Sequence, residues 1–150
     1  MKILLRGKHA THELAVVLGA ALSTAPRLSH ARVIALTGEL GSGKTTFTQS
    51  FGKFLGVNRR LLSPTFALRS QYKTQSKRYP ILEHFDWYRL KGIQDLSPIG
   101  WKEALNDPAR ILIIEWPERA RRALPKSFTH IKLAHTKEKE RSAVITFHGK

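Results

Sequence analysis

Residues 38–45 read GELGSGKT, which matches the pattern G-x-x-x-x-G-K-[ST] at every specified position. Glycines let the backbone N–H groups of such a loop turn toward phosphate oxygens, and the N-terminus of a following helix adds partial positive charge. Lys44 is expected to reach the β- and γ-phosphates, and Thr45 to place its hydroxyl on Mg²⁺. The motif therefore predicts a site for a nucleoside triphosphate and magnesium.

Two acidic residues end apolar segments further along the chain. A phosphate-binding loop is accompanied by an acid that supports the metal ion, usually at the end of a neighbouring buried strand. Glu115 follows the apolar run Ile111–Ile114, and Asp86 follows Ile81–Phe85. Glu115 is therefore the first candidate and Asp86 the second. The alternatives are that Glu115 caps the next helical turn and that Asp86 is an ordinary loop acid.

The segment Ser63-Pro64-Thr65-Phe66 lies between the glycine-rich loop and these acids. Its rigid proline presents the hydroxyl of Thr65, which could sense a γ-phosphate or a metal ion as a switch residue does. Ser-Pro-Thr is also a common turn sequence, so both interpretations stay open.

The elements around the loop are predicted from apolar periodicity. Val33–Thr37 is a β-rich apolar run typical of a strand buried on both faces. The helix after the loop carries an apolar stripe and should end at Gly56, and residues 111–115 form a second buried strand. The order of strand, glycine loop and amphipathic helix is the context that the motif requires.

Weaker signals predict the remaining elements. A strand is expected at 2–6, then a helix with Thr11 as its N-cap that ends at Ala25-Pro26. The other expected elements are strands at 66–72 and 81–86, a short helix from Ser97-Pro98 to Leu105, a helical turn at 117–124, and strands at 131–134 and 143–147. Together they predict an α/β fold in one domain, residues 1–150. This would be a P-loop NTPase-like three-layer sandwich with a largely parallel central sheet and short antiparallel C-terminal strands.

The chain is strongly basic, with 26 Lys and Arg against 11 Asp and Glu and a net charge of +15. Residues 46–82 contain seven basic residues and no acid, and residues 119–150 contain nine basic residues against Glu138 and Glu140. Such an excess favours anionic partners such as RNA, DNA, nucleotides or acidic proteins. A solvated, solubilising surface is the alternative.

Several classes of protein are disfavoured. The chain contains no cysteine, which excludes disulfides and thiolate chemistry. No window approaches the roughly 20 apolar residues of a membrane span, and the charged residues in the first six positions argue against a signal peptide. The seven histidines show no metal-site spacing, and no sequence context selects a Ser-His-Asp triad. These features favour a cytosolic protein.

Four motifs in this order and spacing resemble one family. They are GELGSGKTT at 38–46, SPTF at 63–66, HFDWYRL at 84–90 and IEWP at 114–117. The combination resembles the TsaE family (formerly YjeE), small bacterial P-loop ATPases needed for making threonylcarbamoyladenosine in tRNA. Trp87 departs from the family pattern, in which leucine is usual, and the charge of +15 is also unusual for the family.

The resemblance implies a set of nucleotide contacts. Thr11 would lie near the base, and Arg141 would be a late nucleotide-contacting arginine. The phosphate loop would consist of Glu39, Leu40, Gly41, Ser42, Gly43, Lys44, Thr45 and Thr46.

The resemblance also implies catalytic and metal-binding residues. Asp86 would be the catalytic acid or water-orienting group, acting with Lys44 and with Thr65 in the first switch. Thr45 and Glu115 would hold Mg²⁺, with Trp116 beside them.

The implied activity is Mg²⁺-dependent ATP hydrolysis that is weak alone and depends on TsaD- and TsaB-type partners, which carry out the threonylcarbamoyl transfer. The basic surface leaves direct contact with tRNA open. Two other functions remain possible on the residues alone. One is a nucleotide-dependent RNA- or protein-binding module without essential hydrolysis. The other is a small-molecule kinase, with Arg119, Arg121 and Arg122 as a lid.

Overall fold

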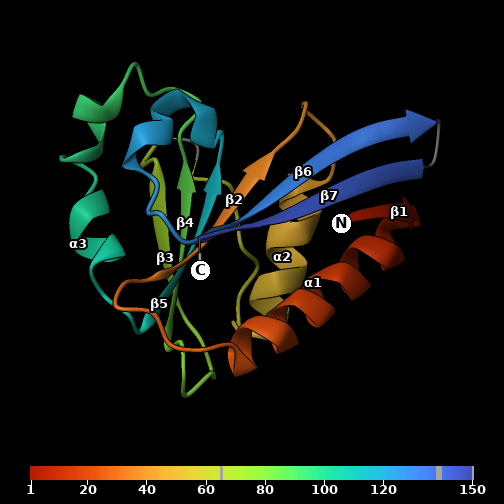
Figure 1. The fold of residues 1–150 in the computed structure, drawn as a ribbon, viewed down its shortest axis with the longest axis horizontal. Coiled ribbons are helices and arrows are strands. Elements are labelled where there is room, and N and C mark those ends of the chain that lie inside the picture. The colour runs from red at the N-terminus through yellow and green to blue at the C-terminus, as the bar shows by residue number, and fades with distance from the viewer. Residues whose placement is uncertain (65, 138–139, 150) are drawn as a thin grey trace.

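One seven-stranded sheet forms the centre of the molecule (Figure 1). The computed structural model describes residues 1–64, 66–137 and 140–149. The strand order is β1-β7-β6-β2-β5-β4-β3. The strands are β1 (Lys2–Arg6), β2 (Arg32–Thr37), β3 (Arg69–Lys73), β4 (Ile81–Asp86), β5 (Arg110–Glu115), β6 (Phe128–Lys137) and β7 (Glu140–His148).

The middle of the sheet is parallel and its margins are antiparallel. Strands β6, β2, β5 and β4 run parallel to one another, whereas β3 is antiparallel to β4, β7 to β6, and β1 to β7. This confirms the predicted α/β fold with a largely parallel centre. The central place of β2 and β5 follows from their continuous apolar sequences, because a strand covered on both faces buries every side chain. Val33 to Leu36 are fully buried.

Helices cover both faces of the sheet, which gives three layers (Figure 1). On one face, α1 (Gly7–Thr24) packs against α2 (Lys44–Phe54), and the phenylalanine stripe of α2 enters the core with Ile34 and Leu36 of β2. The other face carries η1 (Ile93–Leu96), α3 (Trp101–Leu105) and η2 (Pro117–Ala123). A second buried apolar cluster lies under these helices, and Trp87 belongs to it, with its ring centroid 4.9 Å from that of Trp101. The indole therefore packs in a buried aromatic cluster at the position where leucine is usual in the family pattern.

The first helix begins earlier than predicted. The sequence predicts Thr11 as its N-cap, but α1 starts at Gly7 and Thr11 lies buried inside it. The physical reason is the preceding strand, which pairs with β7 as far as Arg6. Gly7, with φ of +79°, then turns the chain directly into the helix. The predicted end at Ala25-Pro26 is confirmed, since Ala25 is the C-cap.

Two internal boundaries also differ from the prediction. The strand expected from Phe66 begins only at Arg69, because Leu68 has a left-handed backbone with φ of +56° and Phe66 is 87% exposed. The helix expected from Ser97 is divided: Ser97 ends η1, and α3 starts after Gly100, which has φ of +69°.

The C-terminal strands are longer than predicted. Strands β6 and β7 have 10 and 9 residues, and they pair along nearly their whole length. Strand β6 also pairs with β2, so this hairpin joins the central sheet to β1. Among the helices in the described part of the chain, none combines the length and apolar composition needed to cross a bilayer.

Candidate nucleotide-binding site

The glycine-rich loop follows β2 at the sheet edge where the parallel strands have their carboxyl ends. Gly43 has φ of +108° and is the N-cap of α2. Gly38 has φ of +147°, and a Cβ there would lie 2.3 Å from the carbonyl oxygen of Leu133. Both backbone conformations are rarely open to other residues. The loop therefore depends on these two glycines for its path.

Lys44 is the first residue of α2, and its side chain turns back over the loop. Its ammonium group donates hydrogen bonds to the carbonyl oxygens of Gly38, at 2.7 Å, and Glu39, at 3.0 Å. It also lies 4.9 Å from the ring centroid of Trp116. The first backbone N–H groups of a helix have no intrahelical acceptor. The start of α2 thus combines a buried cation with backbone donors, the chemistry that holds phosphate oxygens.

Asp86 and Glu115 lie side by side at the same sheet edge. They end the adjacent parallel strands β4 and β5 and are directly paired in the register. Oδ1 of Asp86 accepts a 3.0 Å hydrogen bond from the backbone N–H of Tyr88, which fixes the carboxylate at the strand end. The backbone N–H of Trp87 donates to the carbonyl oxygen of Glu115, at 3.0 Å.

His84 holds Glu115 from within the core. Its Nε2 lies 3.0 Å from Oε1 of Glu115, with 1% and 6% of the two side chains exposed. His84 belongs to the motif HFDWYRL, but no role for it was predicted from the sequence. A signal was present: His84 stands two residues before Asp86, so it lies on the same face of a strand next to the one that ends in Glu115.

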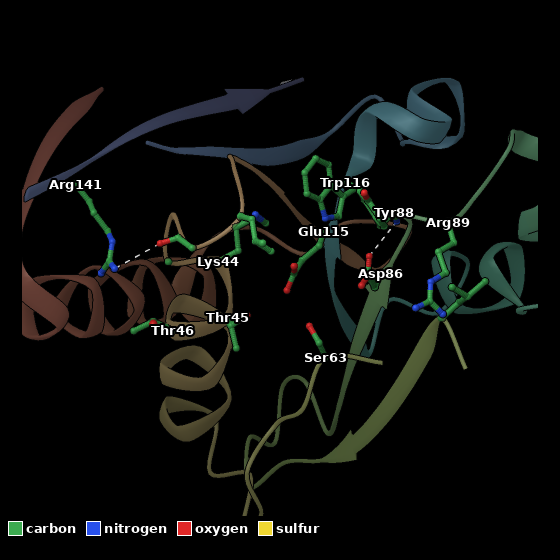
Figure 2. A pocket seen from close by; sticks show the side chains of 14 residues that line it. Lys44, Thr45, Thr46, Ser63, Asp86, Tyr88, Arg89, Glu115, Trp116 and Arg141 are labelled. Atoms are coloured by element: carbon green, nitrogen blue, oxygen red, sulfur yellow. Dashed lines mark hydrogen bonds between the residues drawn. The ribbon is translucent and has the colours of Figure 1, made fainter. Parts of the chain in front are cut away.

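Lys44, Asp86 and Glu115 line a cavity of about 540 Å³. Figure 2 shows Glu115 between Lys44 and Asp86, with Thr45 and Ser63 below it in that view. The predicted site residues that the cavity brings together are Leu40, Gly41, Gly43, Lys44, Thr45, Thr46, Asp86, Glu115 and Arg141. Trp116, expected beside the metal site, also lines it.

Three of the four other predicted site residues, Thr11, Ser42 and Glu39, are not among those that line the cavity. Thr11 and Ser42 are fully buried, and neither side-chain oxygen has a hydrogen-bond partner in the described part of the chain. Glu39 is exposed, and its backbone carbonyl oxygen accepts a hydrogen bond from the ammonium group of Lys44. The fourth, Thr65, lies outside the residues that the structure describes.

Arg141 reaches the loop from β7, far away in the sequence. Its Nη2 lies 3.5 Å from the carbonyl oxygen of Gly41, and its Cδ would be 3.5 Å from a Cβ placed on Gly43 (Figure 2). The long C-terminal hairpin carries this guanidinium to the cavity, where it adds a second cation to that of Lys44. Sequence spacing alone could not show this contact.

The cavity also includes residues that the sequence analysis did not assign to the site: Ser63, Leu68, Tyr88 and Arg89. The ring of Tyr88 lies 5.0 Å from that of Trp116, so the two aromatic residues form one wall. Tyr88 and Arg89 follow Asp86 within the motif HFDWYRL, and that proximity was the available signal.

The donor set fits a triphosphate with magnesium. Lys44, Arg141 and the helix N-terminus present positive charge and N–H donors, whereas Thr45 and Glu115 present the oxygen ligands that Mg²⁺ prefers. Within the described ranges, no group of three or more His, Cys, Asp or Glu could hold a metal ion by itself. Magnesium commonly keeps water and phosphate ligands, so one carboxylate and one hydroxyl are a sufficient protein contribution.

Comparison with known proteins identifies the family. Residues 5–143 match the family model described as "Threonylcarbamoyl adenosine biosynthesis protein TsaE". The tRNA threonylcarbamoyladenosine biosynthesis protein TsaE of Nostoc sp. (strain PCC 7120) is 37% identical over 148 residues, covering 97% of this chain and 85% of that protein. The protein of the same name from Rickettsia felis is 33% identical over 144 residues, or 95% and 78% of the two chains.

A solved structure has the same fold. The crystal structure of Bacillus subtilis YdiB superposes with a TM-score of 0.77 at 24% identity, covering 99% of this chain and 86% of that one. The family match spans the loop, both acidic strand ends and Arg141. On this evidence the chain belongs to the TsaE family of tRNA threonylcarbamoyladenosine biosynthesis proteins.

Proposed function

We propose that this protein binds ATP with Mg²⁺ in the 540 Å³ cavity and hydrolyses it in support of tRNA threonylcarbamoyladenosine biosynthesis. The observation that carries the proposal is the pairing of Asp86 and Glu115 in the register of β4 and β5, within the same cavity as Lys44. A cation, a metal-binding acid and a second acid at one sheet edge are the parts that phosphoryl transfer to water requires.

Each group has a distinct role in the proposal. Lys44 and Arg141, with the first N–H groups of α2, hold the phosphates, and Thr45 and Glu115 hold the metal ion. Magnesium, when bound, neutralises charge on the phosphate oxygens. Asp86 has Oδ1 engaged with the Tyr88 N–H, so its Oδ2 is the atom that orients water and accepts a proton.

Exposed apolar side chains at the rim of the cavity support the proposal that a protein partner binds there. Leu40, in the phosphate loop, is 91% exposed, Phe66 is 87% exposed and Tyr88 is 52% exposed. Phe66 is tied to the rim because the guanidinium of Arg89, which lines the cavity, lies 5.1 Å from its ring. Exposed apolar groups gathered at one place mark interaction surfaces.

We assign this rim to TsaD- and TsaB-type proteins, whose contact would lie near Thr65, Asp86 and Trp116 and would accelerate turnover. The cytoplasm, where tRNA is modified, is the proposed location. A binding module without essential hydrolysis remains the second outcome of the test below. For the kinase, none of Arg119, Arg121 and Arg122 is among the residues lining the cavity, so no observation favours it.

The test measures phosphate release and tRNA modification, with and without the two partner proteins. Lys44→Ala should weaken ATP binding about a hundredfold, since a charge-assisted hydrogen bond contributes about 1.5–3 kcal/mol. Lys102→Ala, on the exposed side of α3, is the matched control and should leave both activities unchanged. Unchanged binding and turnover in folded Lys44→Ala protein would refute the nucleotide site. Tight ATP binding without turnover, even with partners, would favour the binding module.

A further inference from the structure

The end of the molecule opposite the cavity carries a concentrated positive surface. We define this basic end by Lys53, Arg59, Arg60, Lys73 and Lys77, all of them exposed. Lys53 is in the last turn of α2, which runs from the cavity toward the amino ends of the parallel strands. Lys73 ends β3 opposite Ile81, the first residue of β4, and Lys77 follows in the connecting turn. The C-terminal end of α2 and the turn between β3 and β4 thus lie at the opposite end of the sheet from the phosphate loop (Figure 1).

Direct contacts join the two segments that form the basic end. The backbone N–H of Gln75 donates to the carbonyl oxygen of Leu55 at 2.9 Å, and the Gln75 side chain donates to Asn58 at 3.2 Å. Arg59 bridges to β3, donating to the carbonyl oxygen of Gln71 while its guanidinium lies 4.8 Å from the ring of Tyr72. The basic side chains are therefore held on one continuous surface.

This positive charge is not neutralised within the fold. In the part of the chain that the structure describes, no residue of the basic end takes part in an ion pair. Residues 40–82 contain no acid at all. Arg69, from the same acid-free segment, behaves differently, since it is paired with buried Glu83. Arg69 is thus neutralised by a buried acid, whereas the cations of the basic end have no ion-pair partner among the described residues.

The surface between these cations is hollowed and polar. Lys53, Arg59 and Arg60 line a hollow of about 320 Å³ together with the amides of Gln49 and Asn58. Cations interspersed with neutral N–H donors suit phosphate oxygens, which accept both ionic and neutral hydrogen bonds. Clustered like charges repel one another, which makes the arrangement unfavourable unless an anion is bound.

We propose that the basic end binds the phosphate backbone of tRNA, at a site separate from the nucleotide cavity. The proposal rests on the proposed function, because that function brings the protein to tRNA. Backbone recognition fits exposed lysines on flexible stems better than sequence reading does, since phosphate contacts position a nucleic acid without reading its bases. An acidic protein surface is the competing ligand, and the test includes it.

The experiment measures binding of a tRNA transcript to the intact protein, without nucleotide, over a series of salt concentrations. Lys53→Gln, Lys73→Gln and Lys77→Gln are combined in one variant. The matched control combines Lys8→Gln, Lys91→Gln and Lys102→Gln, three exposed lysines elsewhere on the molecule with the same change in net charge. ATP turnover with the partner proteins and thermal unfolding are measured for both variants.

The basic-end variant should bind tRNA at least tenfold more weakly. The plot of log affinity against log salt concentration should become less steep by about 2–3. Each phosphate that the protein no longer neutralises reduces the size of this slope by about 0.7–0.9. The control should change affinity less than threefold. Equal weakening in both variants would overturn the proposal, because binding would then depend on net charge alone.

Unchanged tRNA affinity together with lower partner-stimulated ATP turnover in the basic-end variant would also overturn the proposal and would identify an acidic protein ligand. Since tRNA binding is measured without ATP, failure of the ATPase proposal would appear separately, as absent turnover in every variant.

Discussion

The two ends of the parallel strands carry their charges in opposite ways. At the carboxyl ends, Lys44 is 6% exposed and Glu115 is 4% exposed, and each is held by hydrogen bonds within 3.0 Å. At the amino ends, Lys53, Lys73 and Lys77 are exposed and lack ion pairs in the described residues.

The difference shows how burial sets the function of a charge. A buried ion interacts strongly over short distances and must be fixed by partners, so it can act on one atom of a ligand. An exposed lysine interacts weakly and is screened by salt, so it contributes only as one of a group. Substitutions at the cavity end should therefore have large individual effects, and those at the basic end small cumulative ones.

The largest effect is expected from Asp86. Asp86→Ala should lower partner-stimulated turnover about 10²–10⁴-fold, the usual contribution of a general base, while ATP affinity changes only a few-fold. Phosphate release and equilibrium ATP binding would be measured on the same protein. An Asp86→Ala variant with wild-type turnover would contradict the role given to this carboxylate.

Glu115 is expected to support the binding of Mg²⁺ rather than to orient the attacking water. Glu115→Ala should raise the Mg²⁺ concentration for half-maximal turnover by about 10–100-fold, because the variant removes the carboxylate proposed to hold the ion. The measurement is a magnesium titration at saturating ATP. If Glu115→Ala lowered turnover equally at all magnesium concentrations, the residue would not support the metal.

His84 is expected to act on the metal site through its contact with Glu115. His84→Gln keeps an N–H donor near the position of Nε2, and His84→Leu removes it, which leaves the Glu115 carboxylate buried without this partner. The magnesium requirement should rise about tenfold in His84→Leu and less in His84→Gln. Equal effects in the two variants would indicate a packing role for His84 instead.

A smaller effect concerns stability at the cavity end of β2. Burial lowers the pKa of His130, and His148 and Arg121 lower it further. Its Nε2 lies 2.8 Å from Oγ1 of Thr37, the residue before the phosphate loop. Since the folded state disfavours the charged ring, the unfolded chain takes up the proton first as the pH falls below the ordinary histidine value of about 6.5.

Stability should therefore decrease from pH 7 toward pH 5. The His130→Gln variant should show a flatter dependence of the melting temperature on pH than the parent protein. The difference should be a few degrees, because His130 is only partly buried. Identical pH profiles for the two proteins would show that another group is responsible.

The smallest effect is expected for single substitutions at the basic end. Lys73→Gln alone should weaken tRNA binding less than about fivefold, since one exposed ionic contact contributes about 0.2–1 kcal/mol. The same titration applied to the triple variant should show the accumulated weakening. A single substitution with an effect as large as the triple one would indicate a specific contact instead of a collective surface.

Much of the fold was predictable because local patterns determined it. Val33–Thr37 and Ile111–Glu115 are apolar enough to require burial on both faces, and the loop 38–45 requires a strand before it and a helix after it. These constraints led to the parallel centre and to Lys44, Thr45, Asp86 and Glu115 as site candidates. All four line one cavity.

Errors occurred where long-range pairing overrode local signals. Thr11 has the chemistry of an N-cap, but pairing of β1 with β7 through Arg6 moved the start of the helix to Gly7. The alternation from Phe66 to Tyr72 is typical of a strand, yet Phe66 and Leu68 precede β3. A local pattern contains no information about the strand to which a segment will be hydrogen-bonded.

The sequence by itself determined the family, the phosphate loop and the chemical types available at the carboxyl ends of the strands. The tertiary structure alone decided which groups meet there: His84 with Glu115, Arg141 with Gly41, and Trp116 with Lys44. It also decided that Arg69 is a paired structural residue while Lys53 and Lys73 form an unpaired surface at the other end. The reason is that motif spacing constrains neighbours along the chain, whereas contacts between strands depend on sheet order and register.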